Sequence, residues 1–197
     1  MTVTRTVLDP DAEERLAPLL AQVCDDPAAL PRAVARASRV VGRGPGPEGL
    51  RVEDVARARL VVAACERSAD ATAVLTGAWD DGDADERRAV LLALADVDVA
   101  DAAVPIVLDA LRTNDLRLVA AAMGPYAAAH LPAEHWRHGV LKCLFTGIPL
   151  SAVAGLDVRR DAELDRMVAD YAAERKAAGR EVPADAERLL ATRTSAP

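Results

Sequence analysis

Residues 52–67 read VEDVARARLVVAACER, and this stretch gives the clearest indication of the fold class. Its apolar side chains include Val55, Leu60 and Val61, whose placement predicts one helix over the whole stretch. In the chain of 197 residues, 51% are hydrophobic but only 3% are aromatic. The core must therefore consist of Leu, Val and Ala, which are small enough for helices to approach closely. This composition favours helix packed on helix.

Similar patterns continue on both sides of this stretch, separated by Pro, Gly and Asp. No alternating polar and apolar stretch bounded by hairpin turns predicts a strand. Residues 79–83 are expected to form a loop that caps the next helix. We predict the other helices over residues 10–24, 27–41, 71–78, 84–95, 101–111, 114–122, 132–145 and 161–179, with a short one opening at Pro183.

The sequence predicts a single all-α domain over residues 1–197, built from irregular helical layers. Helix pairs of similar length favour a HEAT-like α-solenoid in the middle, although no repeat of fixed period is visible. Residues 42–51 are rich in Gly and Pro, and are too few to separate two domains, so they are expected to form an internal loop. Residues 192–197 are expected to form a flexible tail.

Charge, apolar runs and cysteine content exclude several classes of protein. The formal charge of -7 disfavours nucleic-acid binding, which needs a basic surface. No apolar run is long enough to span a bilayer, and the N-terminus lacks the pattern of a signal peptide. Cys24, Cys65 and Cys143 are odd in number and widely spaced, which favours reduced thiols over disulfides or a zinc site. These features predict a cytoplasmic protein.

A series of short motifs occurs in order between Leu111 and Arg180, the strongest part of a family resemblance. They are Arg112-Thr113-Asn114, Pro125-Tyr126, Val140-Leu141-Lys142 with Phe145, Pro149-Leu150, Gly155-Leu156-Asp157 with Arg159, Leu164 with Met167, Tyr171 with Glu174-Arg175, and Ala178-Gly179-Arg180. In these motifs the chain resembles the EboA-domain family of metabolite traffic proteins. Weaker motifs at 37–39 and 86–91 extend the resemblance over most of the chain.

The resemblance implies a small helical bacterial protein, encoded among genes that move a specialised metabolite or its precursor out of the cytoplasm. It implies no agreed catalytic residues. The chain departs from the family pattern at several side chains: Gly124, Asp161 and the region of Arg137 and His138 stand where the family has amides, and Lys176 stands where it has Trp. If those amides hold a ligand in the family, the ligand here is expected to differ or to be absent.

Aromatic side chains concentrate in the second half of the chain, as binding surfaces favour. The leading hypothesis is a non-catalytic accessory protein that binds a pathway metabolite, a partner protein of the same gene cluster, or both. We predict no cofactor and no metal. The predicted ligand-binding residues are Tyr126, Trp136, Lys142, Phe145, Tyr171 and Arg175.

Two alternatives stay open. Lys142 lies in an apolar stretch and can act as a base or form a Schiff base, while Asp170 and Glu174 are one helical turn apart. With His138 they form the candidate acid and base groups of a small-molecule enzyme. Ion pairs from the neighbouring arginines are the simpler interpretation of the two carboxylates. The other alternative is a pure protein scaffold.

Three further clusters have simpler interpretations than a site. The histidines at 130, 135 and 138 lack the spacing of known zinc motifs. The aspartates at 80, 81, 83 and 85 are expected to cap a helix start. The basic stripe, defined as Arg32, Arg36, Arg39 and Arg43, can contact a phosphate or an anionic membrane surface, but such stripes are usually solvated faces.

Overall fold

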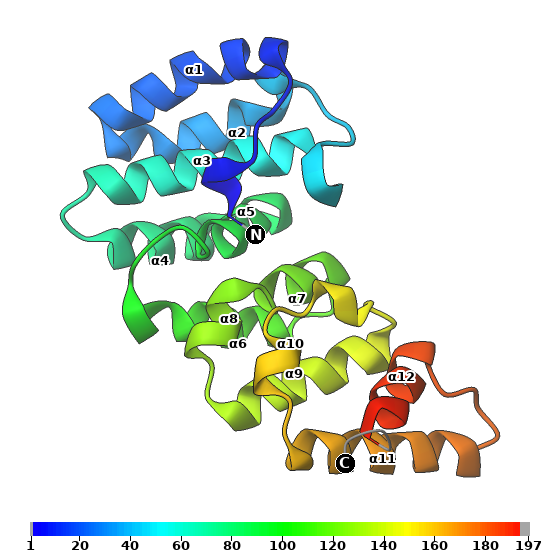
Figure 1. Cartoon of the computed structure of the whole chain (residues 1–197). Coiled ribbons are helices and arrows are strands. Elements are labelled where there is room, and N and C mark those ends of the chain that lie inside the picture. The colour runs from blue at the N-terminus through cyan, green and yellow to red at the C-terminus, as the bar shows by residue number, and fades with distance from the viewer. Residues whose placement is uncertain (1, 194–197) are drawn as a thin grey trace. The chain divides into compact units, whose positions relative to one another are not determined.

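A computed structural model describes residues 2–193 (Figure 1). Within this range the chain forms twelve α-helices and no strand, apart from one isolated antiparallel bridge between Pro45 and Arg51. The prediction of an all-α fold is therefore confirmed. The chain divides into two compact units, one ending at Ala122 and the other beginning at Met123. The predicted single domain and the HEAT-like arrangement stay predictions.

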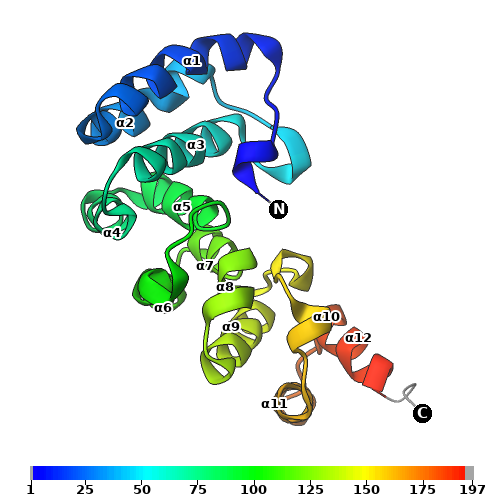
Figure 2. The same cartoon turned by 60° about the vertical axis from the view of Figure 1, so that its left-hand side comes forward.

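The first unit contains seven α-helices. They are α1 (Pro10–Asp25), α2 (Leu30–Val41), α3 (Val52–Arg67), α4 (Ala71–Asp81), α5 (Ala84–Ala93), α6 (Val104–Arg112) and α7 (Leu116–Ala122). A short 3-10 helix, η2 (Pro27–Ala29), precedes α2. Within this unit α3 packs against α1, α2, α4 and α5, and both views show it between α2 and α4 (Figures 1 and 2).

Helix α3 has the bounds expected from its sequence and is buried on nearly all sides. Val55, Leu60 and Ala64 are fully enclosed. Glu53, Asp54 and Arg57 are buried as well. Charges can be enclosed only when they are paired. Glu53 pairs with Arg51, Asp54 with Arg88, and Arg57 lies 3.9 Å from the carboxylate of Asp85.

The expected loop over residues 79–83 is wrong, because α4 continues through Asp81. Trp79 is buried, and its Nε1 donates a hydrogen bond to Oδ2 of Asp109 at 3.1 Å. This long-range hydrogen bond stabilises the last turn of α4, and no local sequence pattern predicts it. The capping prediction fares better at Asp83, whose carboxylate accepts from the backbone N–H groups of Asp85 and Glu86 at the start of α5.

The second unit contains five α-helices: α8 (Pro125–His130), α9 (Ala133–Thr146), α10 (Leu156–Arg159), α11 (Ala162–Ala177) and α12 (Ala184–Arg193). A 3-10 helix, η5 (Leu150–Ala152), lies between α9 and α10. The sequence did not predict the short α8 and α10. Residues 192 and 193 end α12, and the rest of the expected tail, 194–197, lies outside the described residues.

Candidate functional site

Most of the aromatic side chains predicted to bind a ligand are core residues. Trp136 is 1% exposed, and Tyr126 and Tyr171 are 5% exposed. The Tyr126 ring stacks on His130 with the ring centroids 4.4 Å apart. The Tyr171 hydroxyl donates to the carbonyl oxygen of Leu144 at 3.5 Å. These rings stabilise the packing of the second unit and offer little surface to a ligand.

The other three predicted binding residues are more accessible. Phe145 is 60% exposed and lies against Tyr171, with ring centroids 4.4 Å apart. Lys142 is half-buried on the preceding turn of α9. Arg175 Nε donates to the carbonyl oxygen of Glu181 at 2.9 Å, an interaction at the C-terminal end of α11. Of the six residues, the structure brings Phe145 and Tyr171 into contact.

The candidate catalytic residues lie on two packed helices, α9 and α11. Arg166 bridges Glu163 and Asp170, with its guanidinium 2.7 and 2.6 Å from their carboxylates. His138 and Glu174 are exposed. His138 and Arg166 also line a polar groove of about 420 Å³ between the two helices. The ion pair expected for Asp170 is therefore present.

In the described part of the chain, the other histidines and the basic stripe do not form a site together with the residues above. Within residues 2–193 no three His, Cys, Asp or Glu side chains are arranged to hold a metal ion. His135 is exposed. In the basic stripe, three arginines occupy the exposed face of α2, whereas Arg43 follows the helix and donates to Ser38 Oγ at 3.4 Å.

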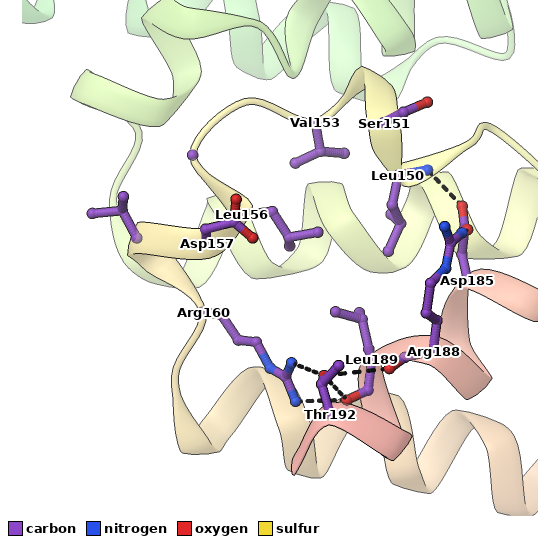
Figure 3. A pocket seen from close by; sticks show the side chains of 12 residues that line it. Leu150, Ser151, Val153, Leu156, Asp157, Arg160, Asp185, Arg188, Leu189 and Thr192 are labelled. Carbon is purple, nitrogen blue, oxygen red and sulfur yellow. Dashed lines mark hydrogen bonds and ion pairs between the residues drawn. The ribbon is translucent and has the colours of Figure 1, made fainter. Parts of the chain in front are cut away.

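A pocket of about 640 Å³ lies in the second unit (Figure 3). One wall is the segment that runs from Leu150 to Arg160, through η5 and α10. The other wall is the face of α12 that carries Asp185, Leu189 and Thr192. The two walls are about 30 residues apart in the sequence, so only the folded chain forms this pocket, hereafter the α12 pocket.

Hydrogen bonds tie the two walls together at both ends of the α12 pocket. At one end Arg160 donates from Nη1 to Thr192 Oγ1 and from Nη2 to the Leu189 carbonyl oxygen, both at 2.6 Å (Figure 3). Its Nε is bound to Asp165. At the other end the Leu150 N–H donates to Asp185 Oδ2 at 2.6 Å. Because all three guanidinium nitrogens of Arg160 donate hydrogen bonds, this side chain connects the two walls and leaves no nitrogen unpaired.

The lining of the α12 pocket is amphipathic. Leu150, Leu156 and Leu189 supply apolar surface. The polar lining includes Ser151 and Asp157, both exposed. Arg188 pairs with Asp185 and is 73% exposed at the side chain, so its guanidinium is accessible from the solvent side. Apolar surface with a few placed polar groups is the usual character of a small-molecule site.

The 150–160 wall is anchored to the core of its unit by Arg159. Its guanidinium donates to the carbonyl oxygens of Ala127 and Leu131 at 2.7 and 2.6 Å, and lies 5.0 Å from the ring centroid of Trp136. Burial lowers the pKa of this guanidinium from its ordinary value. Those carbonyls belong to the last residues of α8 and the residue after it, so Arg159 caps this helix.

A family model described as metabolite traffic protein EboA matches residues 22–191. The chain belongs to the EboA family. No curated protein and no solved structure matches it. The description connects the EboA family with metabolite traffic. Within the described residues, no helix combines the length and apolar character that a membrane crossing requires.

The family motifs of this EboA-family chain include part of one wall of the α12 pocket, but the sequence analysis assigned them no binding role. The motifs Pro149-Leu150 and Gly155-Leu156-Asp157 contribute Leu150, Gly155, Leu156 and Asp157 to the lining. None of the family motifs includes the lining residues of α12. A short helix opened by Pro183 was expected, but no local pattern indicates which segment its apolar face covers.

Proposed function

We propose that this EboA-family protein is a non-catalytic accessory protein that binds a small metabolite of its pathway in the α12 pocket. The observation that carries the proposal is the pocket itself, whose volume of about 640 Å³ lies within the range of small-molecule sites, roughly 300–1,000 Å³. The family's connection with metabolite traffic supports the same conclusion.

The lining indicates an amphipathic ligand. An apolar part of the ligand packs against Leu156 and Leu189, where burying its surface contributes roughly 25 cal/mol for each Å². Polar groups of the ligand bind Ser151, Asp157 or the accessible Arg188. Arg160 contributes indirectly, because its bonds to Thr192 and Leu189 fix the distance between the walls.

The enzyme alternative rests on Lys142, Asp170, Glu174 and His138, none of which lines the α12 pocket. It predicts turnover of a pathway intermediate by the isolated protein. The scaffold alternative is supported by the buried aromatic side chains, which belong to the hydrophobic core. Binding of a partner protein or an anionic membrane through the basic stripe is compatible with a metabolite in the pocket.

Native mass spectrometry of the untagged protein, purified from a host that carries its neighbouring genes, tests the proposal. We expect a bound small molecule in the wild-type protein and in Ser151→Ala, which keeps the pocket open. The adduct should be lost in Ser151→Trp, because the indole fills the pocket from an exposed position. Absence of any adduct, or an adduct that survives in a folded Ser151→Trp protein, would exclude this pocket as the site.

A further inference from the structure

A second pocket, of about 260 Å³, lies in the first unit and plays no part in the proposed function. Its base is formed by the buried Val61 of α3 and Val90 of α5. The start of α2, with Leu30 and Pro31, forms one side. A face of α4 forms the other side of this cavity, hereafter the α4 pocket.

Gly77 keeps the α4 side of this pocket open. It lies in the middle of α4, where glycine weakens a helix relative to alanine. A Cβ at this position would meet no atom within 4 Å, so close packing does not require the glycine. Ala73, Gly77 and Asp81 follow one another at one-turn spacing along the lining, and the two small residues leave room for a ligand.

The charge at the pocket is acidic. Among its described lining residues, Asp81 and Glu86 are the ionisable ones. The Glu86 carboxylate accepts from the backbone N–H of Asp83, whereas no hydrogen bond or ion pair joins the exposed Asp81 carboxylate to another described residue. Asp81 is also the last residue of α4, and the Arg87 guanidinium donates to the carbonyl oxygens of Trp79 and Asp80 just before it, which offsets the negative end of the helix dipole. The cation preference at this end therefore rests on the Asp81 carboxylate, which has no ion-pair partner among the described residues.

We propose that the α4 pocket binds a small organic amine. The apolar body of the amine lies over Val61 and Val90 beside Gly77, and its ammonium group pairs with Asp81. This assignment uses the apolar base, the open glycine and the unmatched carboxylate together. It is independent of the α12 pocket, since no residue lines both.

Three probes with one apolar body and different head groups test the charge preference: 4-phenylbutylamine, 4-phenylbutanol and 4-phenylbutyrate. Each is titrated into the full-length ¹⁵N-labelled protein, and amide chemical shifts are followed. We expect the amides of Val74, Gly77 and Ala78 to shift with the amine. The amine should bind about three-fold more tightly than the alcohol, because a partly exposed ion pair contributes modestly, and the carboxylate should bind most weakly.

Matched variants separate shape from charge. Gly77→Leu fills the pocket and should abolish binding of all probes, whereas Thr76→Leu, on the exposed neighbouring residue outside the lining, should not change it. Asp81→Asn should leave the affinity for the alcohol unchanged and remove the preference for the amine. Leucine is a good helix former, so Gly77→Leu is expected to fold, and circular dichroism checks this. Equal affinity for the three probes, shifts confined to other residues, or binding that persists in folded Gly77→Leu would overturn the proposal.

Discussion

Gly147 and Gly155 show how the same backbone conformation serves different purposes at the scale of a residue. Both have positive φ, 76° and 74°, in the left-handed region that disfavours side chains. A Cβ on Gly147 would meet no atom within 4 Å, whereas one on Gly155 would lie 2.8 Å from Cβ of Ala128. Gly155 therefore permits both a turn and the close approach of the α12-pocket wall to α8.

The pair of glycines gives a controlled prediction. Gly147→Ala should lower the free energy of unfolding by about 1–2 kcal/mol, the cost of the left-handed conformation. Gly155→Ala should cost about 1–3 kcal/mol more, because the added methyl group overpacks against Ala128. Urea unfolding followed by circular dichroism measures both values. Equal losses in the two variants would contradict the steric role of Gly155.

The three cysteines differ in their surroundings and therefore in reactivity. Burial raises the pKa of the Cys65 thiol to about 12 and that of Cys143 to about 11, whereas Cys24 is half-exposed. Because the thiolate is the reactive form, iodoacetamide at about pH 8 should modify Cys24 first in the folded protein. Peptide mass spectrometry against reaction time checks the order. Early modification of Cys143 would show that its helix opens locally.

At the scale of elements, one ion pair connects α9 with the start of α11. Arg137 donates from Nη2 to Asp161 Oδ2 at 2.6 Å and from Nε to both carboxylate oxygens at 3.1 Å. The same carboxylate accepts from the backbone N–H of Leu164 and caps α11. Asp161 therefore holds both Arg137 of α9 and the first turn of α11.

This pair makes stability depend on pH in a known direction. The hydrogen bond from Arg137 lowers the pKa of the Asp161 carboxyl below its ordinary value. The pair therefore contributes stability above the carboxyl's ordinary pKa, and the contribution is lost as the pH falls through the lowered folded-state pKa. Asp161→Asn keeps a capping side chain but removes the charge. Asp161→Ala should cost about 1 kcal/mol more, through the lost cap.

Thermal unfolding of the wild type and Asp161→Asn, from neutral to acid pH, checks the direction. The difference in Tm should be largest near neutrality and should shrink in acid. Since the pair is partly exposed, added salt should reduce the difference at neutral pH. A difference independent of both pH and salt would show that the variant acts by a route other than the charge.

At the scale of the whole molecule, the charge of -7 competes with the local charge of the basic stripe. Three of its arginines lie on one exposed face of α2. Long-range repulsion of a polyanion follows the net charge, whereas a local contact follows the stripe. The two effects therefore predict opposite results for nucleic acid.

We expect no binding of duplex DNA at about 0.1 M salt, because the net charge repels the phosphate backbone. Fluorescence anisotropy of a labelled duplex checks this, with Arg32→Ser/Arg36→Ser/Arg39→Ser as the comparison. Identical, flat titrations for both proteins are the expected result. Binding that is lost in the triple variant would show that the local stripe outweighs the net charge.

Most of the helices could be predicted from local sequence patterns. The bounds of α3 follow from its apolar residues and flanking sequence, and the start of α5 follows from the aspartate that caps it. The end of α4 did not follow, because a bond from Trp79 to a residue 30 positions away holds it. Among site residues, the ion pair of Asp170 with Arg166 was predictable from one-turn spacing. The burial of Tyr126, Trp136 and Tyr171 was not, since aromatic side chains suit a core as well as a binding surface.

The all-α class, most of the helices and the family could be predicted from the sequence, because capping residues, helical periodicity and ordered motifs are properties of neighbouring residues. The positions of the two pockets follow from the folded structure and not from local sequence. The α12 pocket needs residues 150–160 opposite α12, and the α4 pocket needs α2 opposite α4. Such pairings depend on which apolar faces bury one another, and this is set by packing between distant segments that no local pattern encodes.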